Sequence, residues 1–151
     1  MELPTTRAIA GEMRGSGNVS ETARIPNFLV IDDDPVQRMT ISKVGAKAGY
    51  RAVAVATVED AMREIRQQKF DCVTLDLLLG GQNGMLMLSE IADFNPNALL
   101  IVVSGASPAV RESTLGMATA LHLNAAELPK PLDLASLRIL LTNHVNAVGA
   151  P

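Results

Sequence analysis

The stretch FLVIDDDP, from Phe28 to Pro35, decides the fold, because a short apolar run leads directly into acidic residues and a helix start. Residues 28–31 have the length and composition of a buried strand. Asp34 followed by Pro35 predicts a helix N-terminus, since an aspartate side chain caps the first N–H groups and proline already has the backbone angle of a helix. The stretch therefore predicts a strand, a polar strand end and a helix in direct succession.

The same succession of an apolar run and a helical pattern repeats along the chain. The predicted strands are residues 28–31, 52–56, 72–77, 99–103 and 125–128. The predicted helices are residues 35–48, 57–68, 84–94 and 107–123, and a last helix that Asp133 caps. Because the strands are apolar throughout, we expect a parallel sheet that helices cover on both faces.

Polar residues stand where the predicted strands end. They are Asp32, Asp33 and Asp34 after the first strand, Asp76 in the third, Ser104 after the fourth and Lys130 after the fifth. Parallel strands bring their carboxyl ends to one edge, where α/β proteins bind ligands. Neighbouring carboxylates repel one another without a cation, and Mg²⁺ prefers oxygen ligands. A carboxylate can also attack phosphorus, and phosphoryl transfer depends on positioning and charge neutralisation. The edge therefore predicts a magnesium site with a phosphoryl-accepting aspartate.

Four segments carry a resemblance to a known family. FLVIDDDP, CVTLDLLLGGQNG, LIVVSGAS and LPKPLDLASL resemble, in this order, the signature segments of bacterial response-regulator receiver domains, and the match covers residues 27–146. The resemblance implies a CheY-like, flavodoxin-like fold, with five helices around a five-stranded parallel sheet of strand order 2-1-3-4-5.

The resemblance also implies roles for individual residues. Asp76 matches the phosphoacceptor, and Asp32 and Asp33 match the acidic pair that binds Mg²⁺ (or Mn²⁺), with Asp33 as the more direct ligand. The backbone carbonyl of Leu78 is expected to complete the protein ligands of the metal.

Three further positions of the family pattern are present. Ser104 matches the switch hydroxyl, Lys130 the phosphate-binding lysine, and Pro131 the proline that usually follows a cis peptide bond.

The chain departs from the family pattern in three places. The loop after Asp76 lacks the usual proline, and Glu127 stands where receivers usually have a switch aromatic residue. Aromatic switching is therefore not expected, and the output must use another route. The interval from Ser104 to Lys130 is longer than in common receivers. It predicts a lengthened fourth helix, as in receivers joined to EAL domains.

The family implies a set of partners. The phosphoryl donor is expected to be a sensor histidine kinase or a histidine phosphotransfer protein, and the output is expected to be a downstream protein target. The face made by the fourth helix, fifth strand and fifth helix is a candidate homodimer surface. The chain is not expected to be an enzyme beyond its own phosphorylation and dephosphorylation.

Two other functions fit parts of the sequence. A magnesium-dependent phosphoaspartyl phosphohydrolase also uses two acids spaced as Asp32 and Asp34 are, although Pro35 follows at once and the chain is short for a substrate-covering cap. A degenerate receiver would bind partners without phosphorylation; Glu127 and the missing loop proline favour this option, whereas the intact acids, serine and lysine argue against it.

Composition narrows the class of protein. The chain of 151 residues is 48% hydrophobic and 19% charged, which is typical of one globular domain. With a net charge of −3, no long basic run and no apolar run that could span a bilayer, we expect no direct nucleic-acid binding, no membrane insertion and a cytoplasmic location. Residues 1–26 are expected to form a tail or linker, residues 27–147 the receiver domain and residues 148–151 a C-terminal tail.

Overall fold

A computed structural model describes residues 24–79 and 82–148, so most of the predicted N-terminal tail and residues 149–151 lie outside the described residues. Its main sheet has five parallel strands in the order β3-β2-β4-β7-β8. The strands are β2 (Asn27–Ile31), β3 (Arg51–Val55), β4 (Cys72–Asp76), β7 (Leu99–Ser104) and β8 (Asn124–Pro129). Counted along the chain this is the order 2-1-3-4-5, which confirms the predicted fold class.

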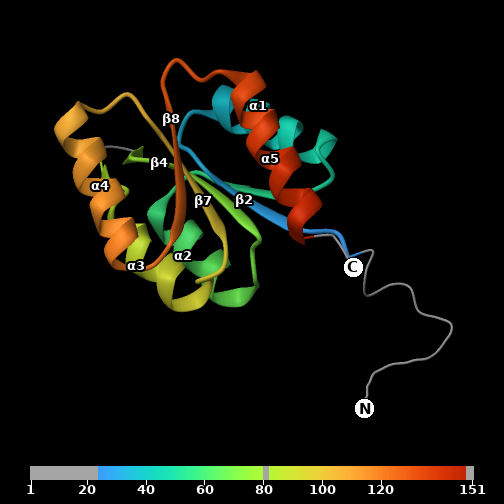
Figure 1. The fold of residues 1–151 in the computed structure, drawn as a ribbon, viewed down its shortest axis with the longest axis horizontal. Coiled ribbons are helices and arrows are strands. Elements are labelled where there is room, and N and C mark those ends of the chain that lie inside the picture. Colours follow the sequence, from blue (N-terminus) through green and yellow to red (C-terminus); the bar gives the residue numbers. More distant parts are fainter. Residues whose placement is uncertain (1–23, 80–81, 149–151) are drawn as a thin grey trace, which may run out of the picture.

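Five helices surround the sheet. They are α1 (Pro35–Lys47), α2 (Val58–Gln67), α3 (Leu86–Phe94), α4 (Pro108–Ala120) and α5 (Leu134–Val148). Helices α1 and α5 lie on one face of the sheet, and α2, α3 and α4 lie on the other (Figure 1). No helix in the described part of the chain is long and apolar enough to cross a membrane.

The sheet separates two hydrophobic cores, because successive side chains of a strand point to opposite faces. In β2, Phe28 and Val30 belong to the core beneath α1 and α5, whereas Leu29 and Ile31 belong to the core beneath α2, α3 and α4. All four side chains are fully buried. This double burial explains why the strands are apolar at every position.

Capping side chains start α1, α2, α4 and α5 at or next to the predicted positions. Asp34 accepts hydrogen bonds from the backbone of α1, and Thr57 accepts from the N–H of Asp60 in α2. Ser107 caps α4 in the same way, and Asp133 accepts from the first turn of α5. Since the first three caps follow soon after strand ends, they turn the chain back along the sheet and leave the strand ends open.

The predicted end of the fourth helix was wrong. We expected it to reach residue 123, but α4 ends at Ala120. His122 has a φ of 61°, a left-handed conformation that cannot continue a helix, and Leu123 is buried in the core beneath α2 and α3. Part of the long interval between Ser104 and Lys130 therefore forms the turn into β8.

The segment after Asp76 also differs from the prediction. The strands β5 (Leu78–Leu79) and β6 (Gln82–Asn83) pair as a short antiparallel hairpin, and α3 begins at Leu86 instead of residue 84. Gly84 donates a backbone hydrogen bond to the carbonyl of Leu77 (2.9 Å), and a Cβ at residue 84 would lie 2.8 Å from the carbonyl oxygen of Asp76. The hairpin thus returns the chain directly behind Asp76, where only glycine fits.

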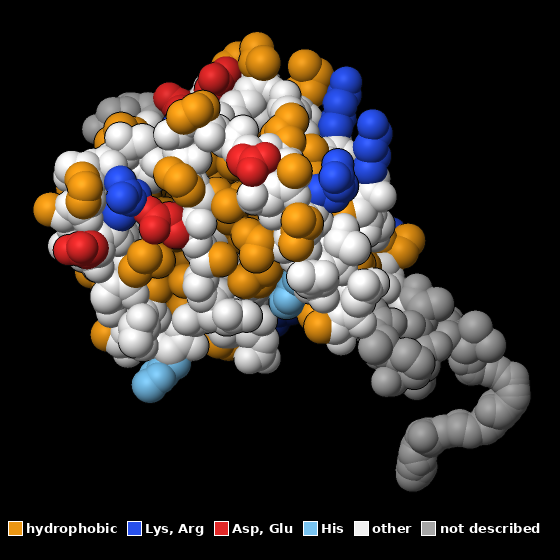
Figure 2. Space-filling model, turned by 45° about the horizontal axis from the view of Figure 1, so that its top comes forward, with side chains coloured by type: hydrophobic (Ala, Val, Ile, Leu, Met, Phe, Trp, Pro, Cys, Tyr) orange, Lys and Arg blue, Asp and Glu red, His pale blue; other side chains and the backbone are white. Residues whose placement is uncertain are grey.

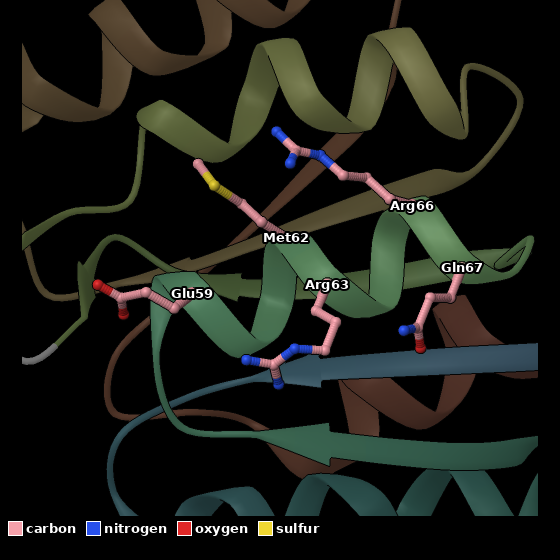
Figure 3. A pocket seen from close by; sticks show the side chains of 5 residues that line it. All are labelled: Glu59, Met62, Arg63, Arg66 and Gln67. Carbon is pink, nitrogen blue, oxygen red and sulfur yellow. The ribbon is translucent and has the colours of Figure 1, made fainter.

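Helices α2 and α3 pack side by side. Met62 and Arg66 point to the side of α2 that faces α3 (Figure 3). Arg66 forms a 2.8 Å ion pair with Glu90 of α3. Arg66 also lies 5.7 Å from the ring centre of Phe94. The surface depression on α2 in Figure 3 includes none of the aspartates that were predicted to bind metal.

Candidate functional site

The carboxyl edge of the sheet collects the predicted site residues. Asp32 directly follows β2, Asp76 ends β4, Ser104 ends β7, and Lys130 directly follows β8. Asp32, Asp76 and Ser104 are buried with at most 3% of their surface exposed, whereas Asp33 is exposed. Residues far apart in the sequence therefore meet because parallel strands share one edge.

Three carboxylates form a compact acid triad, which we define as Asp32, Asp33 and Asp76. Each offers one oxygen, and the three oxygens all lie within 4.8 Å of one another. Burial raises the pKa of Asp32 and the charge of Asp76 adds to this, although hydrogen bonds from Gln37 and Asp34 act in the opposite direction. Since like charges this close are costly without a cation, the triad fits a hard divalent ion that takes oxygen ligands.

Hydrogen bonds hold both oxygens of the Asp76 carboxylate. Oδ2 accepts from the Nζ atom of Lys130 at 3.0 Å, and Oδ1 accepts from the backbone N–H of Leu78 at 3.0 Å. The backbone N–H of Lys130 donates to the carbonyl of Ser104 (3.1 Å), so the ends of β7 and β8 are tied together. Asp76 therefore has a fixed orientation beside a cation, which suits a carboxylate that attacks an electrophilic centre.

The first turn of α1 supports Asp32 from behind. Gln37 donates through Nε2 to Oδ2 of Asp32, Arg38 donates to its carbonyl oxygen (2.8 Å), and the N–H of Asp34 donates to Oδ1 (2.9 Å). Sequence reasoning missed Gln37 and Arg38. Their only signal was their place in the first turn after the acidic run, where helix side chains can reach back to the strand end.

Asp34 lies apart from the acid triad. Its Oδ1 accepts hydrogen bonds from the backbone N–H groups of Val36 (2.9 Å) and Gln37 (3.4 Å). The carboxylate therefore caps α1. This position disfavours the phosphohydrolase alternative, which requires Asp32 and Asp34 to act on one substrate.

Ser104 begins a short loop that leads to α4. Its Oγ accepts from the N–H of Ala106 at 2.8 Å, and the carbonyl of Ala106 accepts from Arg111 of α4 at 2.9 Å. Arg111 also forms an ion pair with Glu127 of β8. Sequence reasoning singled out Glu127 but missed Arg111, because nothing in a helical pattern shows which strand residue an arginine will meet.

Two further predicted residues lie at the same edge. Leu78 begins the β5–β6 hairpin, two residues after Asp76, and its side chain is exposed. The peptide bond between Lys130 and Pro131 is cis, as the family resemblance implied. The metal-binding role of the Leu78 carbonyl stays a prediction.

Comparisons with known proteins place this arrangement in a family. The family model for the response regulator receiver domain matches residues 28–141. The chemotaxis protein CheY of Thermotoga maritima is 35% identical over 77 residues, which are 50% of this chain and 64% of that protein. The transcriptional regulatory protein ZraR of Klebsiella oxytoca is 30% identical over 118 residues, covering 77% of this chain and 25% of that protein.

Solved structures show the same fold. A response regulator protein from Burkholderia pseudomallei, crystallised with a phosphorylated aspartic acid, a calcium ion and citrate, has a TM-score of 0.67 and 28% identity. The match covers 82% of this chain and 69% of that one. The chain spans less than two thirds of the length of the curated relatives above. The chain belongs to the family of response regulator receiver domains.

Proposed function

We propose that this chain is a phosphorylation switch in which Asp76 accepts a phosphoryl group. The observation that carries the proposal is the Asp76 carboxylate, which is buried within the acid triad and held by Lys130 at 3.0 Å. The Burkholderia relative with a phosphorylated aspartic acid supports the same chemistry. The donor is a sensor histidine kinase or a histidine phosphotransfer protein, in the cytoplasm.

The transfer makes one bond and breaks one. An oxygen of the Asp76 carboxylate attacks phosphorus, and the bond between phosphorus and the donor histidine nitrogen breaks, which returns the electron pair to the imidazole. Lys130 pairs with the phosphoryl oxygens, and the Ser104 hydroxyl donates to one of them. Asp32, Asp33 and the carbonyl of Leu78 would hold Mg²⁺ or Mn²⁺ together with Asp76. A bound ion would neutralise charge on the phosphoryl oxygens.

The output in this proposal is a change in protein contacts. Phosphorylation adds negative charge beside Ser104 and so biases the loop that leads to α4. Figure 2 shows hydrophobic side chains on the face that carries α4, β8 and α5, and the exposed apolar residues there include Val110 and Met117 of α4. We expect this face to bind a downstream protein or a second copy of the chain.

Receiver domains are generally not enzymes, and here the only catalysis we propose is the domain's own phosphorylation and dephosphorylation. The relation to receivers joined to EAL domains rests on the interval between Ser104 and Lys130 and stays a prediction. A degenerate receiver would show the same fold without phosphorylation, so the test must measure the modification itself.

Phosphorylation can be measured directly on intact protein. The wild-type chain and Asp76→Asn are incubated with acetyl phosphate and Mg²⁺, and the intact mass of each is measured by mass spectrometry. We expect one phosphoryl addition on wild type, none on Asp76→Asn, and none on wild type when EDTA removes the metal. Asp34→Asn serves as a matched acid control and should still be phosphorylated. An unmodified wild-type chain, under conditions that label another receiver, would contradict the proposal.

A further inference from the structure

Arg111 of α4 bridges the site loop and the sheet. Its NH1 group donates to the carbonyl of Ala106 at 2.9 Å, and its Nε group pairs with the carboxylate of Glu127 in β8. The two paired atoms, Nε and Oε2, are shielded from solvent, although about a quarter to a third of each side chain is exposed (30% and 25%). The two atoms form an ion pair without the geometry of a hydrogen bond, so loss of either charge leaves the other one shielded and uncompensated.

The contacts of Arg111 continue directly to the phosphoryl site. Ala106 accepts from Arg111 through its carbonyl and donates through its N–H to Oγ of Ser104 at 2.8 Å. Within the described residues, Ser104 Oγ bonds to this N–H and not to Asp76 or Lys130. The orientation of the Ser104 side chain is therefore tied to the peptide group of Ala106, and that peptide group is tied to Arg111.

Glu127 completes the chain of contacts from within the β7–β8 strand pair. It lies opposite Val102 of β7 in the strand register, two residues before the pair of Ser104 and Pro129. The ion pair thus fixes Arg111 against the same two strands whose ends form the site. These contacts define a polar relay of four residues, Ser104, Ala106, Arg111 and Glu127.

We propose that Arg111, fixed by Glu127, is a positioning residue that holds the Ser104 hydroxyl in its resting orientation and connects the site with α4 and β8. The inference rests on the proposed function, because it names the regulation of the same site. When the hydroxyl turns to a phosphoryl group on Asp76, it leaves the N–H of Ala106. The Ala106 peptide then turns, and Arg111 loses its bond to the loop.

The polar relay predicts in which direction its loss will change the binding of phosphoryl mimics. A contact that favours the resting state opposes any ligand that favours the other state, and removal of that contact strengthens binding of the ligand. Loss of either charge in the relay should therefore favour phosphoryl mimics at Asp76. The effect should act through Ser104 and should vanish when the hydroxyl is absent.

The experiment titrates beryllofluoride, a phosphoryl mimic, into the protein in Mg²⁺ buffer and follows binding by amide NMR. The variants are Glu127→Gln, Arg111→Gln, Ser104→Ala and the double variant Ser104→Ala with Glu127→Gln. Glu112→Gln is the matched control, because Glu112 is an exposed neighbour of Arg111 on the same helix. Amide exchange of Ala106 without beryllofluoride is measured in parallel, and thermal unfolding shows that each variant is folded.

We expect Glu127→Gln and Arg111→Gln to bind beryllofluoride about fivefold more tightly than wild type, a typical linkage effect. Glu112→Gln should match wild type, and Glu127→Gln should have no effect in the Ser104→Ala background. If Glu127 has a purely structural role, Glu127→Gln will change beryllofluoride affinity as much in the Ser104→Ala background as in wild type, and that result would overturn the inference. Wild-type affinity in both Glu127→Gln and Arg111→Gln would also overturn it.

The proposed function can fail separately from the relay. If wild type and Asp76→Asn respond equally to beryllofluoride, the proposed function is wrong. The exchange of the Ala106 amide then decides the inference. Exchange that is several-fold faster in Glu127→Gln and Arg111→Gln, but not in Glu112→Gln, supports the relay, and equal exchange in all of them overturns it.

Discussion

At the scale of single residues, the site depends on how its carboxylates are held. Asp32 is buried, and each of its side-chain oxygens accepts a hydrogen bond, one from Asp34 and one from Gln37. A carboxylate that is oriented in this way presents its remaining lone pairs in a fixed direction. In the proposed metal site, the residues behind Asp32 should therefore contribute to metal affinity even though they would not touch the ion.

Gln37→Leu tests this support. The leucine keeps the bulk of the side chain but leaves Oδ2 of Asp32 without its donor, so we expect Mg²⁺ affinity to fall about tenfold, the lower end of the range for such supporting residues. Isothermal titration calorimetry measures the affinity. Gln67→Leu, at an exposed position of α2, is the control and should bind as wild type does. Unchanged Mg²⁺ affinity in Gln37→Leu would show that Gln37 does not orient Asp32.

At the scale of elements, the β5–β6 hairpin brings the chain back behind Asp76. The hairpin is short, and the N–H of Gly84 bonds to the carbonyl of Leu77. Because the backbone of Asp76 lies against residue 84, the hairpin packs directly on the residue that we propose as the phosphoacceptor. A change in the hairpin should therefore alter both stability and the position of Asp76.

Two glycine substitutions test this packing, one behind Asp76 and one at an uncrowded position of α4. In Gly84→Ala the new Cβ would lie 2.8 Å from the Asp76 carbonyl, so the backbone must shift. We expect a loss of about 1–3 kcal/mol in the free energy of unfolding, as for other overpacked sites, together with slower phosphorylation. Gly116→Ala in α4 has no heavy atom near its Cβ and should gain about 0.5–1 kcal/mol from helix propensity. Urea unfolding measures the free energy of both variants, and intact mass followed over time measures the rate of phosphorylation. An unchanged free energy of unfolding in Gly84→Ala would contradict the packing argument.

The elements also show how far sequence reasoning reaches. The apolar run of residues 28–31 and the cap Asp34 predicted their strand and helix, because burial on both faces and capping leave local signals. The β5–β6 hairpin and the end of α4 left no such signal. Two-residue strands and a left-handed His122 depend on where the rest of the fold places them.

The candidate site, too, was predictable only in part. Topology brings strand ends together, so the residues of the edge could be named from sequence. The side chains that orient them, such as Gln37 and Arg111, could not, because their contacts depend on rotamers and on tertiary placement.

At the scale of the whole molecule, a second polar centre lies at the opposite edge of the sheet. Asp71 precedes β4 and accepts two hydrogen bonds from Arg24 (2.9 Å each) and one from the N–H of Asn27 (2.8 Å). Its carbonyl lies 2.7 Å from Nε2 of His144 in α5. The side chain of Asp71 is mostly buried, and it ties the start of β2 to the sheet.

This centre predicts a dependence of stability on pH. Burial alone would raise the pKa of Asp71, but the hydrogen bonds from Arg24 and Asn27 outweigh it and lower the pKa. The stabilisation is therefore full above the unfolded pKa of about 3.9 and is lost as the pH falls through the lower, folded pKa. Asp71→Asn should lose about 1–3 kcal/mol of unfolding free energy at pH 7, because charged hydrogen bonds are removed.

Urea unfolding at a series of pH values measures the effect. The difference between wild type and Asp71→Asn should shrink as the pH falls below about 4. Asp93→Asn, at an exposed position near the end of α3, is the control and should differ little from wild type. A difference that does not change with pH would mean that the charge of Asp71 is not the stabilising factor.

The most direct test of the central claim locates the phosphoryl group. The protein is treated with acetyl phosphate and Mg²⁺ and then with borohydride, which reduces an aspartyl phosphate to homoserine. Tandem mass spectrometry of the peptides then identifies the modified residue. The proposed function predicts homoserine at position 76 and aspartate at positions 32, 33 and 34. Homoserine at another of these positions, or at none, would contradict it.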